Sequence, residues 1–117
     1  MKRTAFLLLA VMLILSGCLK KEPPFMGCAD GAFIGEGSGY RKHLKVRLTL
    51  EGGYITAVDV IEHYEKGAEH YEKPIERIPA AIIRDQSVDV DAVSGATLTS
   101  KGIMEAARAA LEQAEQQ

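Results

Sequence analysis

The stretch HLKVRLTL at residues 43–50 constrains the fold more than any other part of this sequence. Apolar and polar side chains alternate strictly along it. The apolar set is Leu44, Val46, Leu48 and Leu50, and the polar set is Lys45, Arg47 and Thr49. Successive side chains of a β-strand point to opposite faces, so this period of two predicts an antiparallel strand with one buried face.

Strand-like segments lie on both sides of this one. Residues 51–53, EGG, predict a turn, and residues 54–64, YITAVDVIEHY, are rich in β-branched side chains. The strand, the turn and this second segment are therefore expected to form a β-hairpin. Residues 30–40, DGAFIGEGSGY, predict a third strand. Glycines inside a strand often mark a place where another group packs against the backbone.

Two helices are expected after the strands. Residues 65–73 are polar and are expected to form a loop, and a short helix follows near residues 75–86. Pro74 and Pro79 mark the start of this helix: Pro74 precedes it, and Pro79 lies within its first turn, the part of a helix in which a proline is tolerated. Its apolar face is formed by Ile75, Ile78, Ile82 and Ile83.

The last helix is expected over about residues 99–114, with Thr99 or Ser100 as its N-cap. Its apolar stripe is Ile103, Ala107, Ala110 and Leu111, and the side chains that face water are Glu105, Arg108 and Glu112. Strands followed by helices, without β-α-β alternation, indicate an α+β domain. We expect a small antiparallel sheet of about three strands packed with two helices.

The beginning of the chain has the pattern of an export signal. Lys2 and Arg3 precede an apolar run at residues 5–15, which is shorter than the roughly 20 residues of a membrane-spanning helix. The run ends in LSGC, residues 15–18, which resembles the lipobox of bacterial lipoproteins. The resemblance implies a lipoprotein signal peptide over residues 1–17. It also implies acyl chains such as palmitate on Cys18, which would anchor the exported protein to the cell membrane or outer membrane. A plain secretory signal with an incidental Cys18 is the alternative.

Residues 18–29, CLKKEPPFMGCA, are expected to be a lipid-anchored tether, stiffened by two prolines, in front of a domain at residues 30–117. At about 3.3–3.6 Å per residue the tether reaches roughly 40 Å. Once Cys18 is acylated, Cys28 is the remaining thiol. We expect Cys28 to be a small buried residue near the start of the fold.

Several functional classes find no support in the sequence. Without Lys2 and Arg3 the chain has 12 basic and 16 acidic residues, a net charge of −4, so a nucleic-acid partner is not expected. The glycines of residues 35–39 have neither the spacing nor the context of a dinucleotide-binding motif, and no haem-attachment or nucleophile-elbow motif occurs. His63, at the end of the segment 54–64, and His70, in the polar loop, have neighbouring glutamates, but not at a spacing typical of metal ligands. We therefore interpret the loop as solvated and expect no metal.

The segment DAVSGATLTS, residues 91–100, stands out because small and hydroxyl side chains replace the long charged ones on either side of it. It leads into the start of the last predicted helix, where unpaired N–H groups and the positive end of the dipole favour a phosphate. Two interpretations follow from the residues alone. The segment is either an N-cap region with Asp91 as an Asx-turn residue, or a place where a small residue, Gly95, lets another group approach.

These residues resemble the flavinylation motif D-x-x-[ST]-G-A-T of the FMN-binding domain family. The matching positions are Asp91, Ser94, Gly95, Ala96 and Thr97. The resemblance extends from Asp30 to about Leu111. It implies that a magnesium-dependent flavin transferase of the ApbE type takes FAD, releases AMP and leaves FMN joined to Thr97 through a phosphoester. The other four residues would form the recognition frame, and Thr99 would be the second candidate for the acceptor.

The resemblance also implies a function. We expect a membrane-tethered electron carrier with covalent FMN, which is not an enzyme by itself and exchanges electrons with a membrane redox donor and a further acceptor. Two alternatives stay open: an exported lipoprotein that serves as a binding module, and an accessory subunit of a membrane redox complex without its own flavin. We further expect Gly35, Gly37 and Gly39 to lie near the motif and to let backbone or the flavin ring approach.

Overall fold

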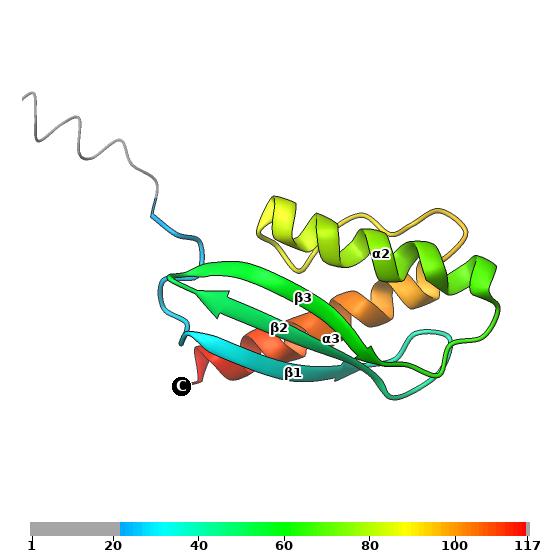
Figure 1. The fold of residues 1–117 in the computed structure, drawn as a ribbon, viewed down its shortest axis with the longest axis horizontal. Coiled ribbons are helices and arrows are strands. Elements are labelled where there is room, and N and C mark those ends of the chain that lie inside the picture. Colours follow the sequence, from blue (N-terminus) through cyan, green and yellow to red (C-terminus); the bar gives the residue numbers. More distant parts are fainter. Residues whose placement is uncertain (1–21, 117) are drawn as a thin grey trace, which may run out of the picture.

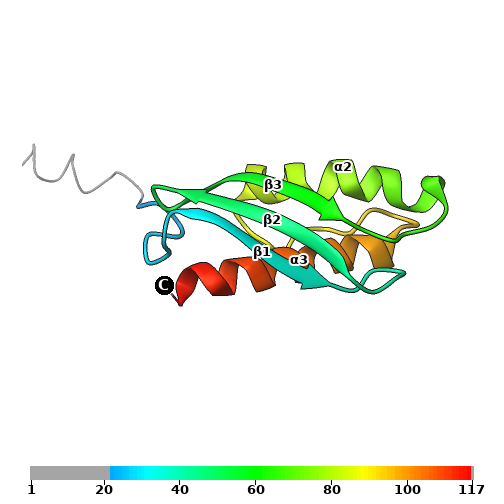
Figure 2. The same ribbon diagram turned by 60° about the horizontal axis from the view of Figure 1, so that its bottom comes forward.

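The computed structural model describes residues 22–116, which form two layers (Figure 1). One layer is an antiparallel sheet in the order β1-β2-β3, and the other consists of two helices that cover one face of that sheet (Figure 2). The elements are β1 (Gly31–Gly37), β2 (Leu44–Glu51), β3 (Tyr54–Glu62), α2 (Ala68–Asp85) and α3 (Thr97–Glu115). The α+β fold expected from the sequence is confirmed.

The apolar side chains of β2 are buried and its polar side chains lie on the other face, as predicted. Each buried aliphatic side chain stabilises the fold by about 1.5–3 kcal/mol. The buried set, at most 1% exposed, is Leu44, Val46, Leu48 and Leu50. In the turn to β3, Gly52 and Gly53 both have a positive φ, 58° and 83°, which is the backbone that a two-residue hairpin turn favours.

The glycines of β1 let the sheet and α3 approach at backbone distance. A side chain on Gly35 would collide with the Ala106 carbonyl and the Ala110 amide of α3. A side chain on Gly37 would collide in the same way with the Gly102 carbonyl and the Ala106 amide. Close approach of backbone is therefore confirmed for these two glycines, but the approaching group is helix α3 beyond the motif at residues 91–97. Of the three glycines expected near the motif, only Gly39 has its nearest neighbours, Glu65 and Thr99, beside a pocket that the motif helps to line.

Helix α2 begins at Ala68 and contains both prolines, so the prediction of a polar loop followed by a short helix after Pro74 was wrong. A proline inside a helix costs about 3 kcal/mol or more, because it removes a hydrogen bond and crowds the preceding turn. Here Pro74 and Pro79 lie on the buried face of α2 together with Ile78 and Ile82. Burial of this face against β3 and α3 offsets the cost.

The end of α2 is tied to the sheet by Gln86. This residue has left-handed backbone, with a φ of 51°. Its side-chain amide accepts from the Ile55 N–H at 2.8 Å and donates to the Ile55 carbonyl at 2.9 Å. The loop that leads to α3 therefore leaves α2 at a defined place beside β3.

Helix α3 begins at Thr97, and its N-cap is Ala96, which has no side-chain hydrogen bond to offer. The prediction that Thr99 or Ser100 caps the helix was wrong, because both lie inside the first turn and are buried. The Ser100 hydroxyl donates to the Ala96 carbonyl at 2.7 Å and accepts from the Val93 N–H at 3.0 Å. The predicted apolar stripe is confirmed: Ile103, Ala107, Ala110 and Leu111 are all buried.

Part of the segment expected to be a tether lies against the domain instead. The Phe25 N–H donates to the Gly53 carbonyl at 2.9 Å, and the Ala29 N–H donates to the Ala114 carbonyl at 3.1 Å. Phe25 and Cys28 also pack against the hydrophobic core. Apolar side chains in this segment gain more from the core than from water, so the folded part begins earlier than residue 30.

The predicted signal peptide, its cleavage site and Cys18 lie outside the described residues. None of the helices within residues 22–116 is long and apolar enough to cross a bilayer.

Candidate functional site

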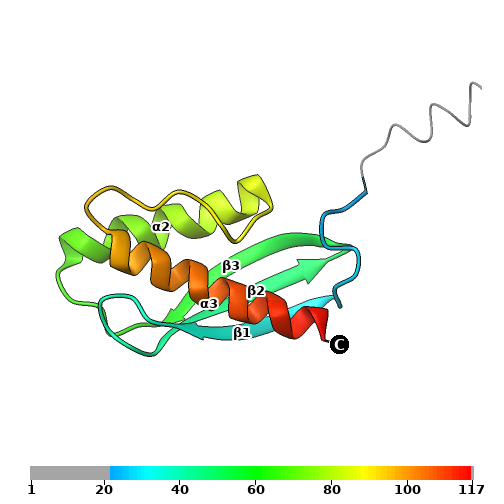
Figure 3. The same cartoon turned by 180° about the vertical axis from the view of Figure 1, so that it is seen from behind.

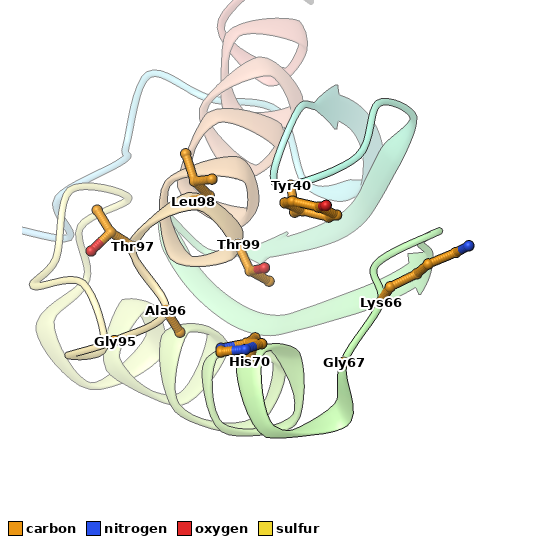
Figure 4. Close-up of a pocket in the computed structure, with 9 residues that line it drawn as sticks. All are labelled: Tyr40, Lys66, Gly67, His70, Gly95, Ala96, Thr97, Leu98 and Thr99. Atoms are coloured by element: carbon orange, nitrogen blue, oxygen red, sulfur yellow. The ribbon is translucent and has the colours of Figure 1, made fainter.

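Three segments meet at one end of the domain: the β1–β2 loop, the start of α2 and the start of α3 (Figure 3). A pocket of about 610 Å³ lies between them (Figure 4). This volume is within the range of about 300–1,000 Å³ that is usual for small-molecule sites. The residues that line the pocket are Tyr40, Lys66, Gly67, His70, Gly95, Ala96, Thr97, Leu98 and Thr99.

The residues of the predicted motif enter α3 through a tight turn. The Ala96 N–H donates to the Val93 carbonyl at 3.0 Å, and Gly95 has a φ of 79°. A positive φ at the third residue of a turn identifies type II, in which that residue is usually glycine. A side chain added to Gly95 would meet no atom within 4 Å, so the backbone conformation, rather than crowding within the described residues, accounts for the glycine.

Asp91 and Ser94 of the motif are exposed. Neither side chain takes part in a hydrogen bond within residues 22–116, so the Asx-turn interpretation of Asp91 is not supported. Earlier in the same loop, Ser87 forms the related turn of serine and threonine, an ST-turn, in which its hydroxyl accepts from the Asp89 N–H at 3.1 Å. Both motif side chains line a second pocket, of about 390 Å³, together with Arg77 and Arg84 of α2. The carboxylate and hydroxyl of the motif are thus open to another molecule.

Thr97 is the first residue of α3 and is exposed. Its side chain points away from Tyr40 and His70 (Figure 4). The N–H groups of the first helical turn have no partner inside a helix, and here the first intrahelical bond of α3 runs from the Ser100 N–H to the Ala96 carbonyl at 3.0 Å. With no side-chain cap, these N–H groups and the positive end of the helix dipole favour an anion beside Thr97.

Thr99 differs sharply from Thr97. Its side chain is only 4% exposed and points into the space between Tyr40 and His70 (Figure 4). Its hydroxyl donates to the Glu65 carboxylate, with 3.1 Å between Thr99 Oγ1 and Glu65 Oε1. The motif threonine, Thr97, therefore has an exposed hydroxyl, whereas the hydroxyl of the nearby Thr99 is buried and hydrogen-bonded.

Glu65 organises this end of the domain, and no pattern in the sequence identifies it. The sequence predicts a solvated loop for its segment, and this prediction is wrong at Glu65, which is only 8% exposed. Besides Thr99, its carboxylate accepts from the Tyr40 N–H at 2.9 Å and the Arg41 N–H at 2.8 Å. A side chain at Gly39 would collide with the Glu65 carboxylate, so this glycine leaves room for the carboxylate in its observed position.

The walls of the pocket contain apolar and titratable groups that the sequence does not identify as site residues. Tyr40 and Leu98 are 61% and 59% exposed, so both present apolar surface to a bound molecule. His70 lies in the first turn of α2, with 3.6 Å between its Nε2 and the Glu69 carboxylate. Within residues 22–116, no three His, Cys, Asp or Glu side chains come together in a way that could hold a metal ion.

Comparison with known proteins identifies a family for the part of the chain that contains the pocket. The family described as "FMN-binding domain" matches residues 39–112, a span that includes every residue lining the pocket. An uncharacterized protein of Treponema pallidum (strain Nichols) is 37% identical over 84 residues. The match covers 72% of this chain and 23% of the relative, so the chain spans about a quarter of the length of that protein. The chain belongs to the FMN-binding domain family.

Proposed function

We propose that the protein is an electron-transfer flavoprotein that holds FMN covalently, through a phosphoester on the Thr97 hydroxyl. The observation that supports this most directly is the position of Thr97: an exposed hydroxyl at the uncapped start of α3, on the rim of a pocket of suitable size. The family match supports FMN as the ligand.

The residues around the pocket fit the chemical parts of FMN. The N–H groups at the start of α3 would hold the phosphate, since a helix N-terminus stabilises negative charge. Tyr40 and Leu98 offer the apolar surface that a flat aromatic ring needs. Bound FMN would supply the redox chemistry, while the protein determines its position and surroundings.

Attachment requires a second protein. In the proposed reaction the Thr97 oxygen forms a bond to the FMN phosphorus of FAD, the phosphoanhydride bond breaks, and AMP leaves with the electron pair of that bond. The hydroxyl proton needs a base, because a threonine hydroxyl is a weak nucleophile. No group within the described residues forms a hydrogen bond to the Thr97 side chain, so a flavin transferase of the ApbE type would provide the base. Asp91 and Ser94 are exposed and available for its recognition of the loop.

The geometry favours Thr97 over Thr99 as the acceptor. The Thr99 oxygen is buried and bound to Glu65, so attack on FAD would first require this end of the domain to open. Thr97 needs no such rearrangement. We therefore propose a single flavinylation site.

The arrangement of the two ends supports a membrane-tethered carrier. Residues 25–29 pack near the end of α3, whereas the pocket lies at its start, and a helix of 19 residues is about 28 Å long. If Cys18 is lipidated, the few residues between it and Phe25 reach about 25 Å at most. The flavin would then be held at the far end from the anchor, where a membrane donor and a soluble acceptor both reach it from the aqueous side.

Intact mass spectrometry tests the proposal. The full-length protein is produced in an exporting bacterium with and without a co-expressed flavin transferase, and the Thr97→Val and Thr99→Ser variants are compared with it. We expect one FMN phosphoester per chain in the parent and in Thr99→Ser, and none in Thr97→Val or without transferase. Valine has nearly the same shape as threonine and carries a methyl group in place of the hydroxyl. Loss of FMN in Thr97→Val would therefore report on the hydroxyl itself.

Two results would contradict the proposal. An unmodified, colourless parent protein would support the alternative of a binding module or accessory subunit without its own flavin. Flavin retained in Thr97→Val would move the attachment to another residue.

A further inference from the structure

We infer that Glu65 is a positioning residue: its buried carboxylate holds Tyr40 and the first turn of α3 in place and so determines where the flavin ring rests and how easily it is reduced. This inference depends on the proposed function, since it concerns the ring of a flavin attached to Thr97.

The first step is the burial of the charge. A carboxylate that is removed from water costs several kcal/mol unless hydrogen bonds replace the lost solvation. The two oxygens of Glu65 accept three hydrogen bonds, from the N–H groups of Tyr40 and Arg41 and from the Thr99 hydroxyl. Among the described residues, no buried side-chain nitrogen or oxygen lacks a partner, so this cost is met locally.

The second step is the location of the donors. Tyr40 belongs to the β1–β2 loop and Thr99 to α3, and both line the pocket. Lys66 and Gly67, which follow Glu65 directly, form a third part of the lining. The carboxylate therefore lies behind the wall of the pocket and connects the three segments that form it.

The third step is the effect of the charge. A ring that accepts electrons gains negative charge, and a carboxylate behind the wall opposes that gain by Coulomb repulsion, which is stronger away from water. Among the other charged or titratable groups at this end, Arg41, Lys66, Glu69 and His70 are exposed and are screened by solvent, although the Arg41 guanidinium lies 5.8 Å from the centre of the Tyr40 ring. His63 is half-buried, and its Nδ1 accepts from the Glu65 N–H at 3.3 Å. We therefore expect Glu65 to lower the reduction potential of the flavin, and its effect on the potential to be larger than the effect of any exposed neighbour.

Glu65→Gln is the variant that tests the inference, and Glu69→Gln is its matched control. A glutamine has one acceptor oxygen and places its NH₂ group against a backbone N–H, so at least one of the three hydrogen bonds is lost. Glu69 carries the same charge at the same end but is exposed. Thr99→Val, compared with Thr99→Ser, is a milder pair that removes one donor and keeps the carboxylate.

Two measurements are made on the full-length protein. In the flavin-free protein, amide hydrogen exchange at Tyr40 and Arg41 should become faster by on the order of tenfold in Glu65→Gln and remain unchanged in Glu69→Gln. In the flavin-loaded protein, the ring should become more fluorescent and more accessible to iodide, and its midpoint potential should move in the positive direction. Thr99→Val should change the fluorescence without the full shift in potential, because the charge remains.

The inference is overturned if the Tyr40 and Arg41 amides exchange at the parental rate in Glu65→Gln. It is also overturned if fluorescence and potential change no more than in Glu69→Gln. Failure of the proposed function gives a different result: the parent protein then carries no FMN by mass, while the exchange measurement still reports on the Glu65 hydrogen bonds. In that case Glu65 has a structural role only.

Discussion

Replacing Gly35 with alanine tests the contact between β1 and α3 on which the fold rests. The added methyl group would collide with the Ala106 carbonyl and the Ala110 amide and would lie 3.0 Å from the Ala109 Cβ. Two of these three atoms belong to helix backbone, which cannot move aside alone, so α3 would have to shift away from the sheet. Gly27→Ala is a matched control, because a methyl group there meets no atom within 4 Å.

The expected magnitude follows from the two opposing effects of the substitution. Overpacking costs about 1–3 kcal/mol, and the collision with two backbone atoms points to the upper end. A glycine-to-alanine change also recovers about 0.4–1 kcal/mol by restricting the unfolded chain. The net loss of stability for Gly35→Ala is therefore about 2 kcal/mol, a substantial part of the roughly 5–15 kcal/mol of a small domain.

Urea unfolding, followed by circular dichroism on the chain from residue 19 onward, measures this loss. With a slope of about 1–3 kcal/mol per M of urea, a loss of about 2 kcal/mol lowers the midpoint by about 0.7–2 M. Gly27→Ala should be unchanged or slightly more stable. If Gly35→Ala unfolds at the same urea concentration as Gly27→Ala, the close backbone contact does not exist in solution and the packing argument is wrong.

Two further predictions concern titratable groups. Hydrogen bonds from Tyr64 and then from Lys45 hold the pKa of Glu62 below its ordinary value of 4.5, so its stabilising contribution is present above that value and is lost as the pH falls through the lower folded pKa. The difference in stability between the parent and Glu62→Gln, measured by urea unfolding, should therefore shrink as the pH falls below 4.5, and a constant difference would contradict this. Burial, and secondarily the Glu115 carboxylate, raises the pKa of the Cys28 thiol. Its alkylation by iodoacetamide at pH 8 should be slower in the folded protein than in urea, and equal rates would show that the thiol is not sheltered.

The elements that could be predicted are those whose pattern is local. The alternation in β2 identified its buried face because a strand has a period of two, and the stripe on α3 was found because a helix has a period of 3.6. The motif at residues 91–97 could be located because its residue types and spacing are specific. The structure places that motif at the start of α3, as expected.

The elements that could not be predicted depend on contacts between distant residues. Two prolines argue locally against a helix, and only the burial of Pro74 and Pro79 with Ile78 and Ile82 explains why α2 continues through them. In the same way, nothing in the segment around Glu65 indicates that its carboxylate is enclosed by a loop 24 and 25 residues earlier and by a helix 34 residues later.

The sequence by itself determined the hairpin, the apolar stripe of the last helix, the α+β class and the position of the motif, because propensity and periodicity act over a few neighbouring residues. The tertiary structure alone decided which of Thr97 and Thr99 is exposed, which groups line the pocket and what the β1 glycines contact. Those properties depend on burial and on hydrogen bonds between segments that the chain brings together only when it folds.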